Sequence, residues 1–220
     1  MKISAHLWEI SRCARRKTWQ ARLQPGMASV TIGLKIFTKR RVAFMSLENV
    51  KAYFKQWDRE EDVLVLPSSS ATVELAAEAL HTEPERIAKT LAFRGIGGEE
   101  ALLVVTAGDA KIDNKKFRQT FGGKARMLSP EETLEHTGHA VGGVCPFGLK
   151  KDLPVYMDVS LKRFTTVFPA CGSGNSAIEL TCEELYTYGK AEKWVDVCKG
   201  WEPAEDYQHA ARTGALTDPQ

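Results

Sequence analysis

The sequence predicts a mixed α/β (α+β) domain in which helices surround a mixed β-sheet. Two observations predict it. Segments with strand patterns and segments with helix signals share the chain but do not alternate strictly, so the βαβ succession of a Rossmann fold is not expected. Hydrophobic residues make up 43% and charged residues 26% of the 220 residues, a composition typical of a globular domain with a sizeable core.

Capping boxes mark the beginnings of three short helices, because a Ser or Thr followed three residues later by Glu satisfies two N-terminal backbone donors. The boxes begin at Thr82, Ser129 and Thr181. The first of these helices is expected to end at Lys89. Further helices are expected after Ser46 as the N-cap, over the Ala-rich residues 72–80, and over the basic residues 113–120.

Short apolar runs bounded by glycine or proline predict the strands. Residues 90–93 and 101–106 flank three glycines and are expected to form a hairpin. The other expected strands cover residues 63–66, 155–159, 166–171, 176–180 and 194–198.

Charge divides the chain into a basic N-terminal part and an acidic remainder. Residues 1–44 contain ten Lys or Arg and one acid, whereas residues 45–220 contain 20 basic and 27 acidic residues. The basic part is expected to be an extension, disordered or upstream of a true start at Met45; a nucleic-acid-binding arm and a transit peptide are the alternatives. One domain is expected over residues 45–199, followed by a mobile tail over residues 200–220.

The cysteine and histidine patterns do not favour disulfides or metal. The five cysteines are odd in number and contain no CxxC pair, so a disulfide framework or a structural zinc site is not expected. His136 and His139 lack a nearby carboxylate or cysteine that would complete a metal site. No stretch reaches the roughly 20 apolar residues of a membrane span. A cytoplasmic protein with reduced thiols, and without membrane attachment, metal or cofactor, is expected.

Three segments carry groups that are suited to chemistry. Lys89 is expected at a helix end, where a lysine is usually a solvated charge but can also face a site. The glycines of residues 142–148 and 171–174 permit close backbone approach and positive φ, so amide groups there can point at a ligand oxygen. Tight turns between strands are the alternative. Neither glycine stretch has the spacing of a P-loop or of a nucleophile elbow.

Other side chains also have two interpretations. Asp158 lies in an apolar strand, where an inward carboxylate needs a hydrogen-bond partner unless it faces a site. Cys145 and Cys171 are either small buried hydrophobes or nucleophiles that need a histidine. Basic side chains are either solvated or contact RNA phosphates, in which case binding is salt dependent. The candidates for phosphate contact are Lys111, Lys115, Lys116, Arg118, Lys150 and Lys151.

In their order along the chain, these segments resemble the YbaK family, relatives of the editing insertion of bacterial prolyl-tRNA synthetases. The similarity covers residues 46–198 and rests on five motifs. The motifs are Lys89-Thr90, Gly108-Asp109, Gly142 to Lys151, Val155 to Asp158, and Cys171-Gly172-Ser173-Gly174 with the strand at Ile178 behind it.

The resemblance implies a barrel-like mixed sheet with a substrate cleft, and it implies catalytic roles. Lys89 corresponds to the active-site lysine of the family, Gly142 to Pro146 to its GxxxP loop, and Asp158 to an aspartate near the substrate. The implied substrate-binding residues are Thr90, Gly143, Val144, Cys145, Phe147, Gly172, Ser173 and Gly174. Family members often carry Ala-Gly and a basic residue where this chain has Gly-Ser-Gly-Asn, so the amino-acid specificity does not follow from the resemblance.

The activity implied by the resemblance is hydrolysis of the ester that joins a wrong amino acid to tRNA. The expected substrate is tRNA(Pro) carrying a small non-cognate amino acid, and a prolyl-tRNA synthetase is an expected partner besides aminoacyl-tRNA. Two alternatives stay open. One is a non-catalytic module of the same fold that binds tRNA or a nucleotide, and the other is a hydrolase with Cys145 or Cys171 as nucleophile.

Overall fold

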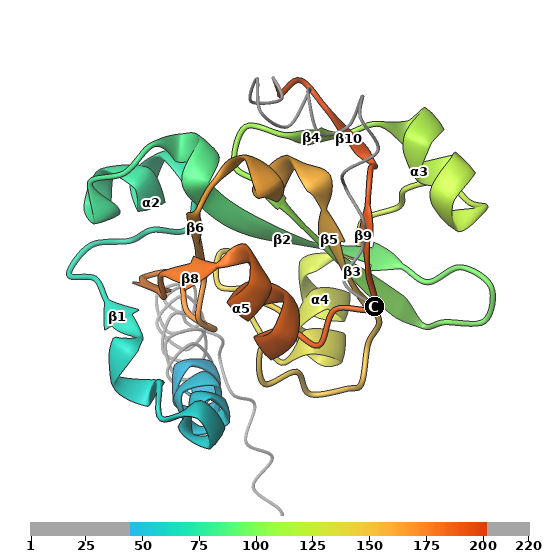
Figure 1. Ribbon diagram of the computed structural model, residues 1–220. Coiled ribbons are helices and arrows are strands. Elements are labelled where there is room, and N and C mark those ends of the chain that lie inside the picture. The colour runs from blue at the N-terminus through green and yellow to red at the C-terminus, as the bar shows by residue number, and fades with distance from the viewer. Residues whose placement is uncertain (1–44, 202–220) are drawn as a thin grey trace, which may run out of the picture.

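A curled, mixed six-stranded sheet forms the centre of the computed structural model, which describes residues 45–201 (Figure 1). Its strands, in spatial order, are β8 (Leu180–Thr181), β6 (Thr166–Pro169), β2 (Ile87–Arg94), β3 (Ala101–Ala107), β5 (Val155–Asp158) and β9 (Lys193–Val195). β2 and β3 pair antiparallel as the predicted hairpin, while β6 runs parallel to β2 and β5 runs parallel to β3. The predicted mixed sheet is confirmed.

Two small sheets flank the central one. β1 (Leu64–Val65) pairs with β7 (Ser176–Ala177), and β4 (Lys111–Ile112) pairs with β10 (Cys198–Lys199). The expected strands over residues 176–180 and 194–198 are therefore each divided into two strands that belong to different sheets. The expected strand over residues 166–171 ends at Pro169, beyond which the chain turns away through Gly172.

Helices surround the sheet, as expected. They comprise residues 45–54, α2 (Val73–Leu80), α3 (Asn114–Phe121), α4 (Pro130–Thr137) and α5 (Cys182–Tyr188). Figure 1 shows α2 at the left and α3 at the right of the molecule, at opposite ends of β2. Short 3₁₀ turns are η1 (Lys55–Trp57), η2 (Glu60–Asp62), η3 (Pro84–Arg86) and η4 (Val159–Arg163).

Two of the three predicted capping boxes are present and one is not. The hydroxyls of Ser129 and Thr181 each accept from the N3 backbone amide, and the N3 glutamate accepts from the N-cap backbone amide. After Thr82 the chain forms only the 3₁₀ turn η3 and then enters β2. The predicted helix ending at Lys89 is therefore wrong. Pairing of β2 with β3 and β6 outweighs the local helix signal, because it satisfies the backbone and buries residues on both faces.

Ser46 is not the N-cap of the first described helix. Residues 45 and 46 are already helical, and the Ser46 side chain is buried against His139 instead. The helix turns apolar side chains into the core, since Val50 and Phe54 are fully buried. The aromatic rings of Phe54 and Phe147 pack 4.8 Å apart, which fixes the helix against the chain around Phe147.

The core is continuous across the sheet. Every residue of β3 is buried, so this central strand is covered on both faces. Phe93 of β2 packs on Phe117 of α3, and Phe117 packs on Phe121. Together these contacts hold the β2–β3 hairpin rigidly, and β2 forms one wall of the candidate site.

Some predictions concern residues that lie outside the described part of the chain. These are the basic extension over residues 1–44 and nearly all of the mobile tail over residues 200–220. Within residues 45–201, no helix is long and apolar enough to cross a membrane.

Candidate active site

A cavity of about 410 Å³ opens between α2, β2 and the glycine-rich chain after α4. Its walls are α2 with the residues before it, residues 87–92 of β2, the segment that leads into α4, residues 141–144, and the β6–β7 region. Most of the lining side chains are apolar. Met127 and Val141 are 60% and 61% exposed and lie in this lining, so they form an apolar rim at its mouth.

The polar lining of the cavity is sparse. Lys89 is the one charged side chain among the described residues that line it, and no Asp, Glu, His or Cys of the described chain does so. Hydroxyl groups come from Thr90 and Thr133, among others. The Thr90 hydroxyl is buried and has no hydrogen-bond partner in residues 45–201. Acid–base catalysis by a carboxylate or imidazole of the described residues therefore has no candidate in this cavity.

Lys89 is held in place by two backbone carbonyls. Its Nζ donates to the oxygens of Gly108 and Ala110 at 2.8 and 2.6 Å. Burial lowers the pKa of this ammonium group, and the nearby charge of Lys111 acts in the same direction. Gly108 permits the arrangement, because a Cβ there would lie 1.9 Å from the carbonyl oxygen of Pro84. Lys89 thus lines the cavity while its ammonium group is fixed by the chain that follows β3.

The two glycine stretches, 30 residues apart in sequence, lie directly against each other. We call Gly142 to Pro146 the GxxxP loop and Cys171 to Gly174 the Ser173 loop. A Cβ on Gly143 would lie 2.7 Å from backbone carbons of Gly172 and Ser173, so only glycine allows this contact without displacement.

The GxxxP loop presents free backbone donors at the cavity. Gly142 has a φ of 95°, in the region that glycine favours. Gly142 and Val144 line the cavity, and within residues 45–201 their amide groups donate no hydrogen bond, whereas the amide of Gly143 donates to the oxygen of Ala140. Unpaired amides beside a cavity are suited to an oxygen atom that gains negative charge.

Asp158 lies outside the cavity lining. It is fully buried, one carboxylate oxygen accepts from the amide of Ser160 at 3.0 Å, and the other accepts from the amide of Val197 at 2.9 Å. The carboxylate thus caps η4 and anchors the chain between β9 and β10.

The other expected catalytic and substrate-binding residues divide into two groups. Those that line the cavity are Lys89, Thr90, Gly142 and Val144. Those that lie outside the lining are Gly143, Cys145, Pro146, Phe147, Gly172, Ser173 and Gly174.

The geometry of Cys145 and Cys171 disfavours a thiolate nucleophile. Both side chains are fully buried, and neither lines the cavity. Burial raises the pKa of Cys145 to about 12 and raises that of Cys171 well above its ordinary value. The Sγ of Cys145 lies 3.6 Å from His139, but burial lowers the pKa of this imidazole, so it is a poor acceptor for the thiol proton.

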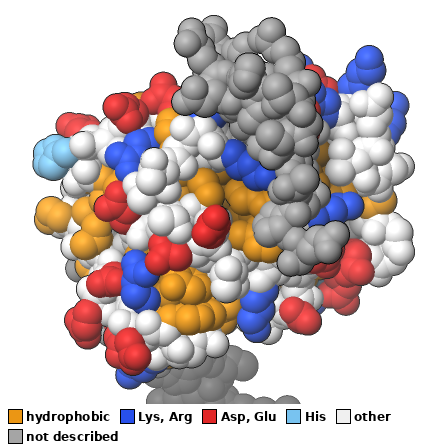
Figure 2. Space-filling model, viewed as in Figure 1, with side chains coloured by type: hydrophobic (Ala, Val, Ile, Leu, Met, Phe, Trp, Pro, Cys, Tyr) orange, Lys and Arg blue, Asp and Glu red, His pale blue; other side chains and the backbone are white. Residues whose placement is uncertain are grey.

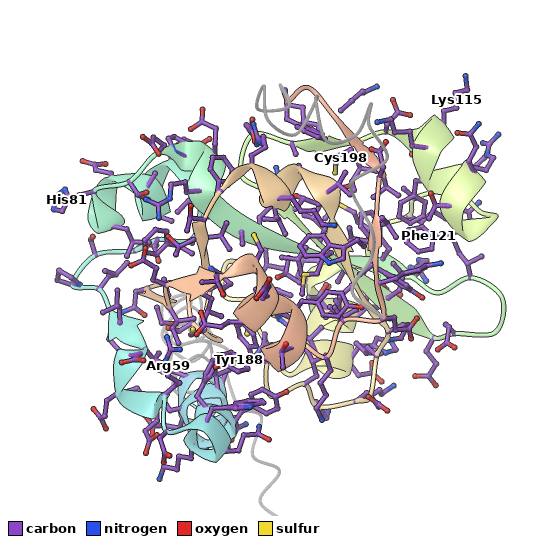
Figure 3. The ribbon with its side chains drawn as sticks, in the orientation of Figure 1. Arg59, His81, Lys115, Phe121, Tyr188 and Cys198 are labelled. Atoms are coloured by element: carbon purple, nitrogen blue, oxygen red, sulfur yellow. The ribbon has the colours of Figure 1, made fainter. Side chains whose placement is uncertain are left out.

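The basic side chains fall into two groups. Lys116 is engaged by Asp196 and by the carbonyl of Cys198, and Lys151 is engaged by Glu100. The described structure gives no ion pair to Lys111, Lys115, Arg118 and Lys150. Figure 3 shows Lys115 on α3 pointing away from the body of the protein, and Figure 2 shows blue side chains at the same corner, with acidic and basic groups mixed over the rest of the face.

Sequence reasoning missed α2 and the residues before it as a wall of the cavity. Ala71 lies against the GxxxP loop, 2.9 Å from where a Cβ of Gly142 would be. The Ala-rich composition that predicted a helix here was also the signal for close packing, because alanine lets backbones approach. Thr133, one turn into α4, was missed as well. No group of three or more potential metal ligands occurs in residues 45–201.

The fold and the cavity define a domain of the aminoacyl-tRNA editing class. The model of the aminoacyl-tRNA editing domain family matches residues 68–188, and the chain belongs to this family. It is 64% identical to the uncharacterized protein YwhH of Bacillus subtilis, in a match that covers 72% of this chain and all of YwhH. It is 30% identical to EbsC of Enterococcus faecalis, whose name proposes a Cys-tRNA(Pro)/Cys-tRNA(Cys) deacylase, over 52% of this chain and 70% of EbsC.

Larger enzymes and a solved structure show the same relationship. The proline–tRNA ligase of Maridesulfovibrio salexigens is 34% identical over 49% of this chain, but the match covers only 18% of the ligase. A crystal structure described as a proposed trans-editing enzyme for prolyl-tRNA synthetase superposes with a TM-score of 0.64 at 32% identity. That match covers 70% of this chain and 98% of the other. The resemblance to the YbaK family is confirmed.

Proposed function

We propose that the protein hydrolyses the ester bond of a mischarged tRNA, with tRNA(Pro) carrying a small non-cognate amino acid as the substrate. One observation carries the proposal: the ammonium-bearing side chain of Lys89 and the unpaired amides of Gly142 and Val144 border a single cavity with mostly apolar walls. The names of the relatives support it, since EbsC is named for deacylation of tRNA(Pro) and a structural neighbour for editing beside prolyl-tRNA synthetase.

The chemistry needs positioning more than proton transfer. An aminoacyl ester is already reactive toward water. Its hydrolysis therefore needs a correctly positioned water molecule and hydrogen-bond donors that stabilise the negative charge on the ester carbonyl oxygen. The amides of Gly142 and Val144 are proposed to receive that oxygen. Lys89 is proposed to hold the acceptor end of the tRNA, or the ester carbonyl, by its fixed charge. The ribose 2′-hydroxyl next to the ester is the proposed source of further assistance.

The apolar walls suit a small acyl group. An apolar pocket discriminates one methylene by only about 1–3 kcal/mol, which is why a synthetase needs a second, hydrolytic selection step. Here Ala71, in the segment before α2, brings the wall close to the GxxxP loop. Thr90, whose hydroxyl lacks a partner, is proposed to contact the substrate as well.

The tRNA itself is proposed to approach over β4 and α3. Lys111 is exposed on β4 and directly follows Ala110, whose carbonyl oxygen accepts from the ammonium group of Lys89. Lys115, Lys116 and Arg118 continue this basic region on α3. A prolyl-tRNA synthetase is a proposed partner that would deliver the charged tRNA.

A panel of mischarged tRNAs tests the proposed function directly. tRNA(Pro) and other tRNAs charged with Ala, Cys, Ser or Thr are incubated with the protein, and the rate of deacylation is measured. Lys89→Ala is expected to lower kcat/KM by about 100-fold or more, comparable with loss of an oxyanion donor, while thermal unfolding shows that the variant is folded. Deacylation by Lys89→Ala at the wild-type rate would refute the assignment of the site.

A second function, tRNA binding without turnover, is favoured by one specific observation. The described cavity lining contains no carboxylate, imidazole or thiol that could act as a general base, and residues 45–220 are net acidic. A tRNA band shift with no deacylation of any substrate in the panel would support this alternative over the hydrolase.

A further inference from the structure

We propose that His139, held by Ser46, is a positioning residue that fixes the GxxxP loop in the geometry required for ester hydrolysis. The inference rests on the proposed function and adds to it two residues that do not line the cavity. Sequence reasoning considered His139 only as a metal ligand and Ser46 only as a helix cap.

His139 closes the chain segment that contains the GxxxP loop. Its side chain is 1% exposed, and Nε2 lies 2.9 Å from the carbonyl oxygen of Phe147, the residue directly after the loop. The backbone amide of His139 donates to the hydroxyl of Thr137 at 3.0 Å, which ties the residue to the end of α4. One imidazole thus bridges the two ends of the segment from residue 139 to residue 147.

The hydrogen bonds define the protonation state of this imidazole. A carbonyl oxygen only accepts, so Nε2 carries the proton and donates it to Phe147. Nδ1 must then accept, and the hydroxyl of Ser46 donates to it at 2.5 Å. Burial lowers the pKa of His139, in agreement with a neutral ring. Ser46 therefore selects the tautomer that can hold Phe147.

Ser46 also contacts the Ser173 loop. A Cβ on Gly172 would lie 2.7 Å from the carbonyl oxygen of Ser46, and a Cβ on Gly143 of the GxxxP loop would lie 2.7 Å from the backbone of Gly172. The helix of residues 45–54, the imidazole and both glycine loops consequently form one buried cluster behind the free amides of Gly142 and Val144. The buried hydrogen bonds of Ser46 and His139 thus have a structural role, because the GxxxP loop that they hold does not pair with a strand.

Steady-state deacylation kinetics of four variants test the proposal. His139→Leu removes both hydrogen bonds, and Ser46→Ala removes the group that selects the tautomer. Both are expected to lower kcat by about tenfold or more with little change in KM, because misplacing catalytic donors by about 1 Å costs up to about 100-fold. His139→Gln places an amide nitrogen where Nε2 was and is expected to restore most of kcat.

The control is Thr181→Ala, which removes the N-cap of α5, outside the cavity lining, and is expected to lower the thermal stability. It is expected to leave kcat unchanged. Adding Ser46→Ala to His139→Gln is expected to have no further effect, because Ser46 acts through the imidazole. Unchanged kcat in Ser46→Ala and His139→Leu, or a loss that follows thermal stability equally in Thr181→Ala, would overturn the proposal.

Amide hydrogen exchange of the peptide covering residues 140–147 separates this inference from the proposed function. Faster exchange in Ser46→Ala and His139→Leu, but not in His139→Gln or Thr181→Ala, is expected. If the wild-type protein deacylates none of the charged tRNAs, the proposed function fails, and the exchange measurement still decides whether His139 fixes the loop. Exchange at the wild-type rate in all four variants would overturn the inference.

Discussion

The two walls of the cavity are built in different ways. The wall that carries Lys89 is strand β2, which is paired with β3 from Ala88 to Arg94 and with β6 at its start. The opposite wall is the GxxxP loop, which has no strand neighbour and depends on the Ser173 loop and on His139. The backbone of Lys89 is thus fixed by the sheet, whereas the GxxxP loop is held by its backbone contact with the Ser173 loop and by the hydrogen bond of His139 to Phe147.

This difference predicts different consequences for mutations. A substitution that disturbs the sheet breaks cooperative backbone pairing and is expected to lower the free energy of unfolding. A defect on the loop side leaves the sheet intact and should appear as lost activity in a folded protein.

The largest effect is expected on the sheet side, at Asp158. Asp158→Ala would leave the buried amides of Ser160 and Val197 without acceptors, which costs about 1–3 kcal/mol for each unsatisfied group. A drop in Tm of roughly 10 °C is expected from about 3 kcal/mol in a domain of this size. Asp158→Asn keeps one acceptor oxygen and should lose about half as much. Both are measured by thermal unfolding.

The same variants test the catalytic role implied for Asp158 by the resemblance. Both oxygens of the carboxylate accept from backbone amides, so Asp158 is expected to stabilise the fold and not to contact the substrate. At a temperature where Asp158→Asn is folded, its kcat for deacylation should stay close to the wild-type value. Full loss of kcat with an unchanged Tm would show instead that Asp158 takes part in catalysis, and the contrast between the walls would fail there.

On the loop side, Gly143→Ala is expected to cost activity more than stability. The added Cβ would lie 2.7 Å from rigid backbone of the Ser173 loop, so the two loops must separate. Overpacking of this kind costs about 1–3 kcal/mol. Displacement of the neighbouring amides is expected to lower kcat by about tenfold or more.

Gly123→Ala is the matched control for this variant. There the added Cβ would lie 2.8 Å from the end of the Ile96 side chain, which can move. Activity in Gly123→Ala should stay at the wild-type level. Equal kcat for Gly143→Ala and Gly123→Ala would show that the loop contact has no bearing on catalysis.

The sequence predicted those features of the fold that depend on local interactions. The capping boxes at Ser129 and Thr181 act within one helical turn, and both formed as expected. The box at Thr82 failed because β2 gains more from two strand partners than from a helix, and strand partners are not visible in a local pattern. The position of Lys89 in the cavity wall was therefore anticipated by the family resemblance and not by its predicted secondary structure.

Parts of the candidate site depend on contacts between distant residues, which the sequence did not reveal. The glycine loops were recognised separately, but the need for Gly143 arises only where it meets Gly172 in space. Ser46 and His139 are 93 residues apart, and each had a plausible local role that the structure replaces with a shared one. Composition likewise could not show which lysines are engaged by neighbouring acids.

The smallest expected effect concerns the direction from which the tRNA approaches. Lys111 lies on the side of β4, near Lys89, whereas Lys150 follows the GxxxP loop, next to a lysine already paired with Glu100. If the acceptor end crosses the β4 side, Lys111→Ala removes one phosphate contact and lowers the slope of log kcat/KM against log salt by about 1. Lys150→Ala, an exposed lysine with the same substitution, should leave the slope unchanged. The measurement is kcat/KM for deacylation from low to physiological salt in both variants. If the salt slope changes only in Lys150→Ala, the tRNA crosses the side of the GxxxP loop and not the β4 side.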